Sequence, residues 1–266
     1  MKRLLIVAVA LLLASPADAQ LAPPNEAGVT YGHVHLNVRD IEVHKKLWVE
    51  HFDAIVVQKG PLTAVKLPGM LIAFRQAAPT GGSAGTVMDH FGFKVRNLAE
   101  VLARWRAAGY AVTREFIGSE GFPNAYLLGP DETRIELQED KTLPVKASAY
   151  HLHFLTPDFV KLRDWYVETF SLVPRKRGTI DTTADVPGMN LSFATSPAPT
   201  VGTKGRTIDH IGFEIKNLEA FCKKLEARGI KFDIPYREVP NIGLKIAYIT
   251  DPSGVYIELT EGFTQY

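Results

Sequence analysis

The sequence has little cysteine and little net charge. Its 266 residues include a single cysteine, Cys222, which excludes a framework of internal disulfides. Its 30 basic and 29 acidic side chains give a formal net charge of +1, without the basic excess that nucleic-acid binding requires. No apolar run after residue 14 is long enough to cross a bilayer. We therefore expect a chain stabilised by buried apolar area, with neither a nucleic acid nor a membrane as its partner.

The first residues have the composition of a secretory signal peptide. A basic start precedes an apolar run over residues 4–14, and residues 17–19, Ala-Asp-Ala, fit the small-residue cleavage pattern. We predict that residues 1–19 are removed, which would make the mature protein periplasmic or secreted. An uncleaved interfacial anchor is the alternative, but it leaves the cleavage pattern unexplained.

A ten-residue motif occurs twice in the chain. It reads DHFGFKVRNL over residues 89–98 and DHIGFEIKNL over residues 209–218, and each copy opens a segment that closes on the glutamate of an I-E-L triplet. Landmarks along the whole chain repeat with a shift that drifts only from 118 residues, for His33 and His151, to 122, for Glu136 and Glu258. The repeat predicts a duplicated domain, with copies over residues 28–140 and 147–264.

Each half divides again into a strand, a helix and further strands. We expect helices over residues 40–51 and 158–170, and one after each copy of the motif, where Leu98, Val101, Leu102 and Trp105 fall at helical spacing. Cys222 lies on the corresponding apolar stripe of the second half and is expected in the core. The pattern predicts an α+β fold with mostly antiparallel sheets.

Strand alternation places histidines and glutamates on the polar faces of the predicted strands. These residues are His33, His35, His90 and Glu136 in the first half, and His151, His153, His210 and Glu258 in the second. Polar faces of half-buried strands often simply face water. The recurrence in both halves favours metal binding, because two imidazoles and a carboxylate suit a divalent ion and leave positions open for substrate.

The order of these residues resembles the vicinal oxygen chelate superfamily of glyoxalase I, extradiol dioxygenases and bleomycin- and fosfomycin-resistance proteins. The resemblance rests on the first histidine, the D-H-I-x-F strand and the closing D-P-x-G-x-x-I-E-L, and it extends over the mature chain. It implies four βαβββ modules forming two tandem half-barrel domains. It also implies a divalent ion (Fe, Mn, Zn or Ni) in each half, with His153 facing substrate. The implied ligand groups are His151 with His210 and Glu258, and His33 with His90 and Glu136.

The closing segment of the second half resembles that of the extradiol dioxygenases, with Tyr248 ten positions before Glu258. The resemblance implies that Tyr248 hydrogen-bonds the substrate or assists proton transfer. The alternative is a tyrosine whose hydroxyl only caps a strand edge. Two histidines that those enzymes place in the active site have no counterpart in this chain, which weakens the dioxygenase interpretation.

Asn190 and Ser192 share one strand face where the first half has Leu71 and Ala73. We expect Asn190 and Ser192 to contact the substrate if this face lines a cavity, and to meet solvent otherwise. Neither half offers the acidic fourth ligand of glyoxalase I-like enzymes on this strand.

The leading hypothesis is an exported metal-dependent enzyme that acts by Lewis-acid catalysis on a small oxygen-chelating substrate, as a lyase or isomerase. An Fe(II)-dependent ring-cleaving dioxygenase is the second. A non-catalytic binding protein like those of bleomycin resistance is the third, although sequestration needs no metal ligands in both halves.

Overall fold

The computed structural model describes residues 21–266, so the predicted signal peptide lies outside the described residues. Within the described part, no helix is long and apolar enough to cross a membrane. The chain forms four successive modules, each a strand, a helix and three more strands, which confirms the predicted α+β arrangement of βαβββ modules.

The four modules have closely similar element lengths. Modules one and two contain β1 (Val29–Val38), α1 (Ile41–Phe52), β2 (Ile55–Lys59), β3 (Leu62–Leu67) and β4 (Met70–Gln76), then β5 (Met88–Val95), α2 (Leu98–Ala107), β6 (Ala111–Ile117), β7 (Pro123–Leu128), η1 (Pro130–Glu132) and β8 (Arg134–Glu139). Modules three and four contain β9 (Ala147–Leu155), α3 (Phe159–Phe170), β10 (Val173–Arg177), β11 (Ile180–Val186) and β12 (Met189–Ala194), then β13 (Ile208–Ile215), α4 (Leu218–Ala227), β14 (Phe232–Val239), η2 (Pro240–Ile242), β15 (Leu244–Thr250), β16 (Tyr256–Glu261) and η3 (Phe263–Gln265).

Two eight-stranded sheets are built across the two halves of the sequence. One has the order β14-β15-β16-β13-β1-β4-β3-β2 and joins modules four and one. The other has the order β10-β11-β12-β9-β5-β8-β7-β6 and joins modules three and two. Each sheet is antiparallel at its centre, where β1 meets β13 and β5 meets β9, and contains two parallel pairs. Each predicted domain therefore contributes one module to each sheet.

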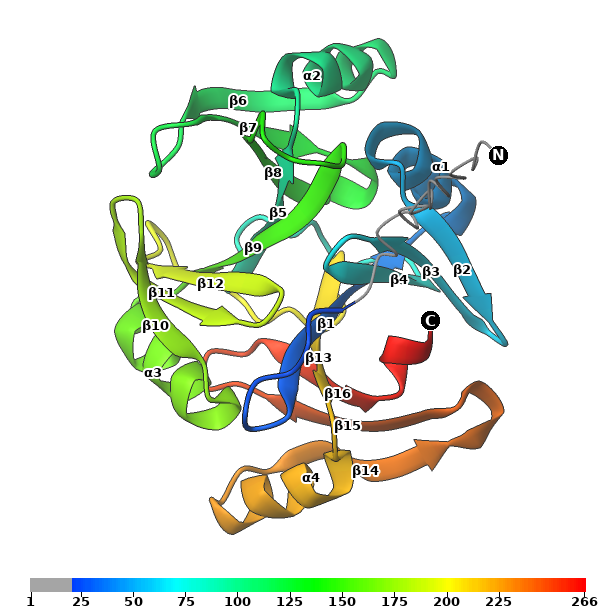
Figure 1. The fold of residues 1–266 in the computed structure, drawn as a ribbon, viewed down its shortest axis with the longest axis vertical. Coiled ribbons are helices and arrows are strands. Elements are labelled where there is room, and N and C mark those ends of the chain that lie inside the picture. Colours follow the sequence, from blue (N-terminus) through cyan, green and yellow to red (C-terminus); the bar gives the residue numbers. More distant parts are fainter. Residues whose placement is uncertain (1–20) are drawn as a thin grey trace, which may run out of the picture.

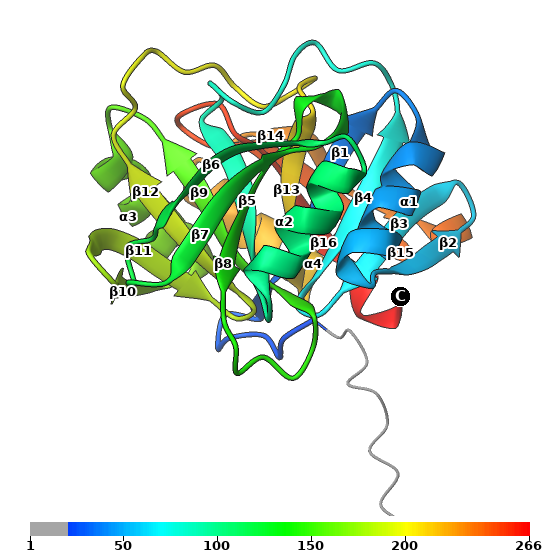
Figure 2. The ribbon, with the colours of Figure 1, turned by 90° about the horizontal axis from the view of Figure 1, so that it is seen from above.

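Both sheets curve into open half-barrels with the helices on their outer side (Figure 1). In Figure 2, α1 and α2 lie in front of the strands that they cover. We call the concave face of the β14-to-β2 sheet the first cup and that of the β10-to-β6 sheet the second cup. The C-terminal η3 lies within the curve of the first cup (Figure 1).

The helices and the convex faces of the sheets enclose one large apolar core. In this core, modules that are neighbours in sequence pack on each other: Trp48 of α1 lies 5.7 Å from Phe93 of β5, and Phe170 of α3 stacks on Phe213 of β13 at 4.1 Å, between ring centroids. Cys222 is buried on the apolar stripe of α4, as predicted. Each half of the chain thus shares a core on the helix side, while its strands pair with those of the other half.

Local sequence signals account for the helix ends. The side chain of Asp40 accepts hydrogen bonds from Glu42 N and Val43 N, and Asn97 and Asn217 cap α2 and α4 through Glu100 N and Ala220 N. These caps begin α1, α2 and α4 directly after their strands, whereas α3 begins after Asp158 without a side-chain cap. The preceding strand is thereby held with its histidines on the concave face.

Candidate metal centres

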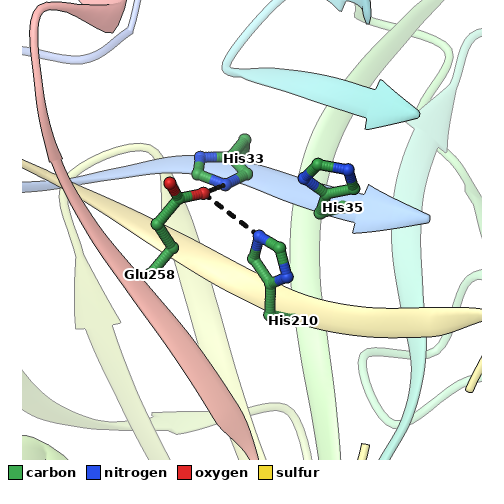
Figure 3. Close-up of side chains that lie close together, drawn as sticks. All are labelled: His33, His35, His210 and Glu258. Carbon is green, nitrogen blue, oxygen red and sulfur yellow. Dashed lines mark hydrogen bonds and ion pairs between the residues drawn. The ribbon is translucent and has the colours of Figure 1, made fainter. Parts of the chain in front are cut away.

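The first cup holds three side chains that converge on one point (Figure 3). His33 of β1 and His210 of β13 place their Nε2 atoms 2.9 and 3.1 Å from Oε2 of Glu258 on β16. All three are buried, and His35 of β1 lies beside them. One ligand atom from each of the four residues lies within 4.8 Å of the others.

The second cup repeats this arrangement. His90 of β5 and His151 of β9 place their Nε2 atoms 2.9 and 3.1 Å from Oε2 of Glu136 on β8. His153 completes a four-residue cluster of the same dimensions. The two clusters therefore match atom for atom, although their residues come from different modules.

The structure brings together all six predicted metal ligands, but the grouping expected from the sequence is wrong. His151 joins His90 and Glu136 rather than His210 and Glu258, and His33 joins the latter pair. The reason is the strand order: β1 lies beside β13 and β9 beside β5, so the first histidine of each half meets the second histidine and the glutamate of the other half. The local sequence pattern carries no information on this long-range pairing.

A glycine in the repeated motif makes room for each first histidine. Gly212 is the cross-strand partner of His33, and Gly92 is that of His151. A Cβ atom on Gly212 would lie 2.5 Å from Nε2 of His33, and one on Gly92 would lie 2.8 Å from Nε2 of His151. The glycines of the D-H-x-G-F motifs thus leave room for the imidazoles to approach the neighbouring strand closely.

Aspartates fix the orientation of the other two histidines. Nδ1–H of His210 donates to Oδ1 of Asp209 at 2.7 Å, and His90 does the same with Asp89. A neutral ring with its proton on Nδ1 presents the lone pair of Nε2 to the carboxylate of Glu258, only 3.1 Å away. Two electron-rich atoms this close need a cation between them, either a proton or a metal ion.

The pKa values show how strongly this position attracts positive charge. Burial alone lowers the pKa of His210, but its hydrogen bonds to Asp209 and Glu258 outweigh burial and raise it above the ordinary value. Burial alone raises the pKa of Glu258, yet contacts with His210 and His33 hold it well below its usual range. The carboxylate therefore stays ionised, and either a proton or a divalent ion can balance it.

The ligand spacing suits a divalent transition metal. Ligands bound at about 2.1 Å and at right angles around an ion stand roughly 3 Å apart. The separations of 2.9 and 3.1 Å in each cup match that value. Two imidazoles and one carboxylate leave further positions open, so the residues of both clusters fit such an ion.

The residues predicted to meet substrate are divided between the cups. Tyr248 lies in the first cup, where its ring centroid is 5.4 Å from that of His210. Asn190 and Ser192 are buried in the second cup, in register with His151 and His153 of β9, rather than facing solvent. The functional roles given to these residues stay predictions.

A cavity of about 230 Å³ opens beside the first cluster. It reaches Glu258, His35 and Tyr248, and its other walls are mostly apolar. A larger groove of about 560 Å³, between Gly28, Glu238 and Glu261, contains no residue of either cluster. The smaller cavity is therefore the one that relates to the chemistry.

Sequence reasoning missed two side chains of the second cup. Asn124 donates to Oε1 of Glu136 at 2.6 Å, and Arg177 is buried beside Ser192. Asn124 could have been found, because it shares a strand face with Tyr126. Arg177 stands in a run of basic residues, and nothing in that run distinguishes it from its exposed neighbours.

The fold and the two clusters define the class of protein: it has tandem half-barrels, with a His/His/Glu group in each of two cups. Residues 149–259 match the model of the Glyoxalase/Bleomycin resistance protein/Dioxygenase superfamily. The repeat and the fold extend the same architecture to the first half, so the whole described chain has the tandem fold, while the match to the superfamily model is confined to residues 149–259.

Solved structures share this fold at low sequence identity. Glyoxalase I from Zea mays is 16% identical, with a TM-score of 0.65, over 89% of this chain and 94% of that chain. A candidate dioxygenase from Bacillus subtilis subsp. subtilis str. 168 is 13% identical, with a TM-score of 0.69, over 92% of this chain and 88% of that chain. No curated protein matches the chain in sequence. At these identities the likeness establishes the fold alone.

Proposed function

We propose that the protein is a metal-dependent enzyme that acts on a small oxygen-chelating substrate by lyase or isomerase chemistry. The observation that carries this proposal is the convergence, in each cup, of two imidazole Nε2 atoms on one buried carboxylate oxygen. A divalent ion (Fe, Mn, Zn or Ni) held there would supply Lewis acidity toward two neighbouring substrate oxygens.

The residues around the first cluster have distinct roles in this proposal. Asp209 holds the ring of His210 so that Nε2 points into the cup. His35 lines the cavity, and its Nε2 has no hydrogen-bond partner among the described residues. Burial, and then the neighbouring His210, keep the pKa of His35 well below its usual range, so its ring is neutral and has a nitrogen lone pair that can accept a hydrogen bond from a substrate hydroxyl. Tyr248 lines the same cavity, and in this proposal its hydroxyl would donate a hydrogen bond to a substrate oxygen.

Elemental analysis of purified protein tests the proposal. We expect two ions per chain in the wild type and one in His210→Ala or His90→Ala, with His51→Gln as a control because His51 is buried outside both clusters. A wild type that holds less than one ion per chain after loading would contradict metal-dependent catalysis and favour the binding-protein alternative.

Ring cleavage is a second candidate for the first cup. The apolar walls of its cavity, including Leu62, Val239 and Ile242, favour an aromatic substrate. Oxygen uptake with a panel of catechols and Fe(II) tests this reaction. Uptake that is lost in His210→Ala would establish ring cleavage, and its absence with every catechol would leave the lyase or isomerase proposal.

We also propose that the protein is exported, on the basis of the signal-peptide pattern in residues 1–19. Fractionation of cells and N-terminal sequencing of the mature chain test this. A full-length chain that is recovered only with the cytoplasmic fraction would refute export.

A further inference from the structure

The two cups carry opposite polarity at equivalent positions. On the strand beside the first histidines, the first cup has Leu71 and Ala73 where the second has Asn190 and Ser192. Two positions before the tyrosine that pairs with the glutamate, the first cup has Ile246 in the place of Asn124. All of these side chains are buried. A duplicated fold with matched metal ligands has therefore diverged in the walls around them.

A buried guanidinium is the main feature of the second cup. Arg177 ends β10 and is only 3% exposed. One of its terminal nitrogens donates to Oγ of Ser192 at 2.8 Å, and Ser192 is in register with His153 of the metal cluster. Its other terminal nitrogen lies 3.4 Å from a carboxylate oxygen of Glu120. The Nε–H group is buried and has no hydrogen-bond partner among residues 21–266.

The corresponding cation of the first cup is turned away. Lys59 ends β2 as Arg177 ends β10, and each is followed by a glycine with positive φ. Nζ of Lys59 lies over the ring of the C-terminal Tyr266, 4.2 Å from its centroid. Ile242, which stands where the second cup has Glu120, lines the apolar cavity. Only the second cup thus combines a buried cation with hydrogen-bonding walls.

We propose that the second cup binds a small anion through Arg177, by a carboxylate or phosphate group, while the first cup takes an apolar group. The proposal rests on the proposed function in one respect: the anion would bind next to the cluster of His90, His151 and Glu136. A planar guanidinium suits two oxygens of one anionic group, and the unpartnered Nε–H supplies a free donor. A groove of about 300 Å³ reaches Tyr150 and Asn190, which hydrogen-bond Glu120 and Ser192, but it does not reach Arg177 or the cluster.

Glu120 is the internal competitor for this anion. Its carboxylate accepts hydrogen bonds from Arg177 and from the hydroxyl of Tyr150, and its side chain is 20% exposed. An incoming anion would replace Glu120 at the guanidinium, and Glu120 could turn toward solvent. This competition predicts opposite effects for changes at the two residues.

The test is calorimetric titration of the loaded full-length protein with inorganic phosphate and, separately, with oxalate. The variants are Arg177→Met, Arg177→Lys, Glu120→Gln and, as the matched control in the first cup, Lys59→Met. We expect Arg177→Met to weaken binding about tenfold or more, Arg177→Lys to weaken it less, and Lys59→Met to leave it unchanged. Glu120→Gln should tighten binding severalfold. The ratio of the two affinities identifies the preferred anionic group.

Two results would overturn the proposal. One is a wild type without saturable binding of either anion in the millimolar range, and the other is an Arg177→Met variant that binds as the wild type does. Circular dichroism shows whether Arg177→Met folds. If it does not, Glu120→Gln is the deciding variant, and anion binding by Glu120→Gln that is unchanged or weaker than in the wild type would count against the proposal. The titrations are repeated on chelator-treated protein, from which metal has been removed. Anion binding that is still weakened by Arg177→Met in that sample supports the anion site even if the metal proposal fails.

Discussion

Substitution of Gly212 by alanine tests the geometry of the first cluster through a residue that binds nothing itself. The added Cβ would lie 2.5 Å from Nε2 of His33, whereas ordinary contacts begin at 3.4 Å. The ring atoms Cε1 and Nδ1 would lie closer still, so the ring must retreat by more than about 1 Å, several times the roughly 0.2 Å by which metal–ligand distances vary in good sites. We expect the first cup to lose its ion and the free energy of unfolding to fall by about 1–3 kcal/mol, as is usual for overpacking.

The assay is elemental analysis together with thermal unfolding. Gly212→Ala and Gly92→Ala should each hold one ion fewer than the wild type, and the double variant should hold none. Gly129→Ala is the control, because its added Cβ would meet its nearest neighbour, the carbonyl oxygen of Thr133, at an ordinary 3.6 Å. Retention of both ions by Gly212→Ala would refute the argument that the glycine positions His33.

Further predictions concern the same cup. His33→Ala and His210→Ala should each remove the same single ion, so the double variant should lose no more metal than either alone; loss of two ions would restore the grouping by sequence halves. Metal affinity can be measured by chelator competition between about pH 6 and 8. It should fall as the pH falls through the raised pKa of His210, because a protonated Nε2 cannot bind an ion. An affinity independent of pH would contradict this prediction. Tyr248→Phe should keep the metal content and, if the Tyr248 hydroxyl transfers a proton, lower turnover in the first cup about a hundredfold. Unchanged turnover would show that Tyr248 contributes only to packing.

Features that depend on neighbours in sequence could be predicted from the sequence. The stripe through Leu98, Val101, Leu102 and Trp105 gives the observed α2, and Asn97 caps it, because helix periodicity and capping act within a few residues. Strand alternation likewise places His33 and His35 on one face, and this face proves to be the concave one. The repeat established the number and type of modules, since duplication leaves a direct record in the chain.

The sequence by itself determined the modules, the faces of their strands and which side chains could bind a metal. Tertiary structure alone decided which of those side chains meet, because β1 pairs with β13, where His33 is opposite Gly212, and β9 pairs with β5, where His151 is opposite Gly92. It also decided that the cups differ: Arg177 is buried against Ser192, while Lys59, at the corresponding strand end, lies over Tyr266. Such pairings follow from the packing of whole sheets and buried surfaces, and no local pattern in the chain encodes them.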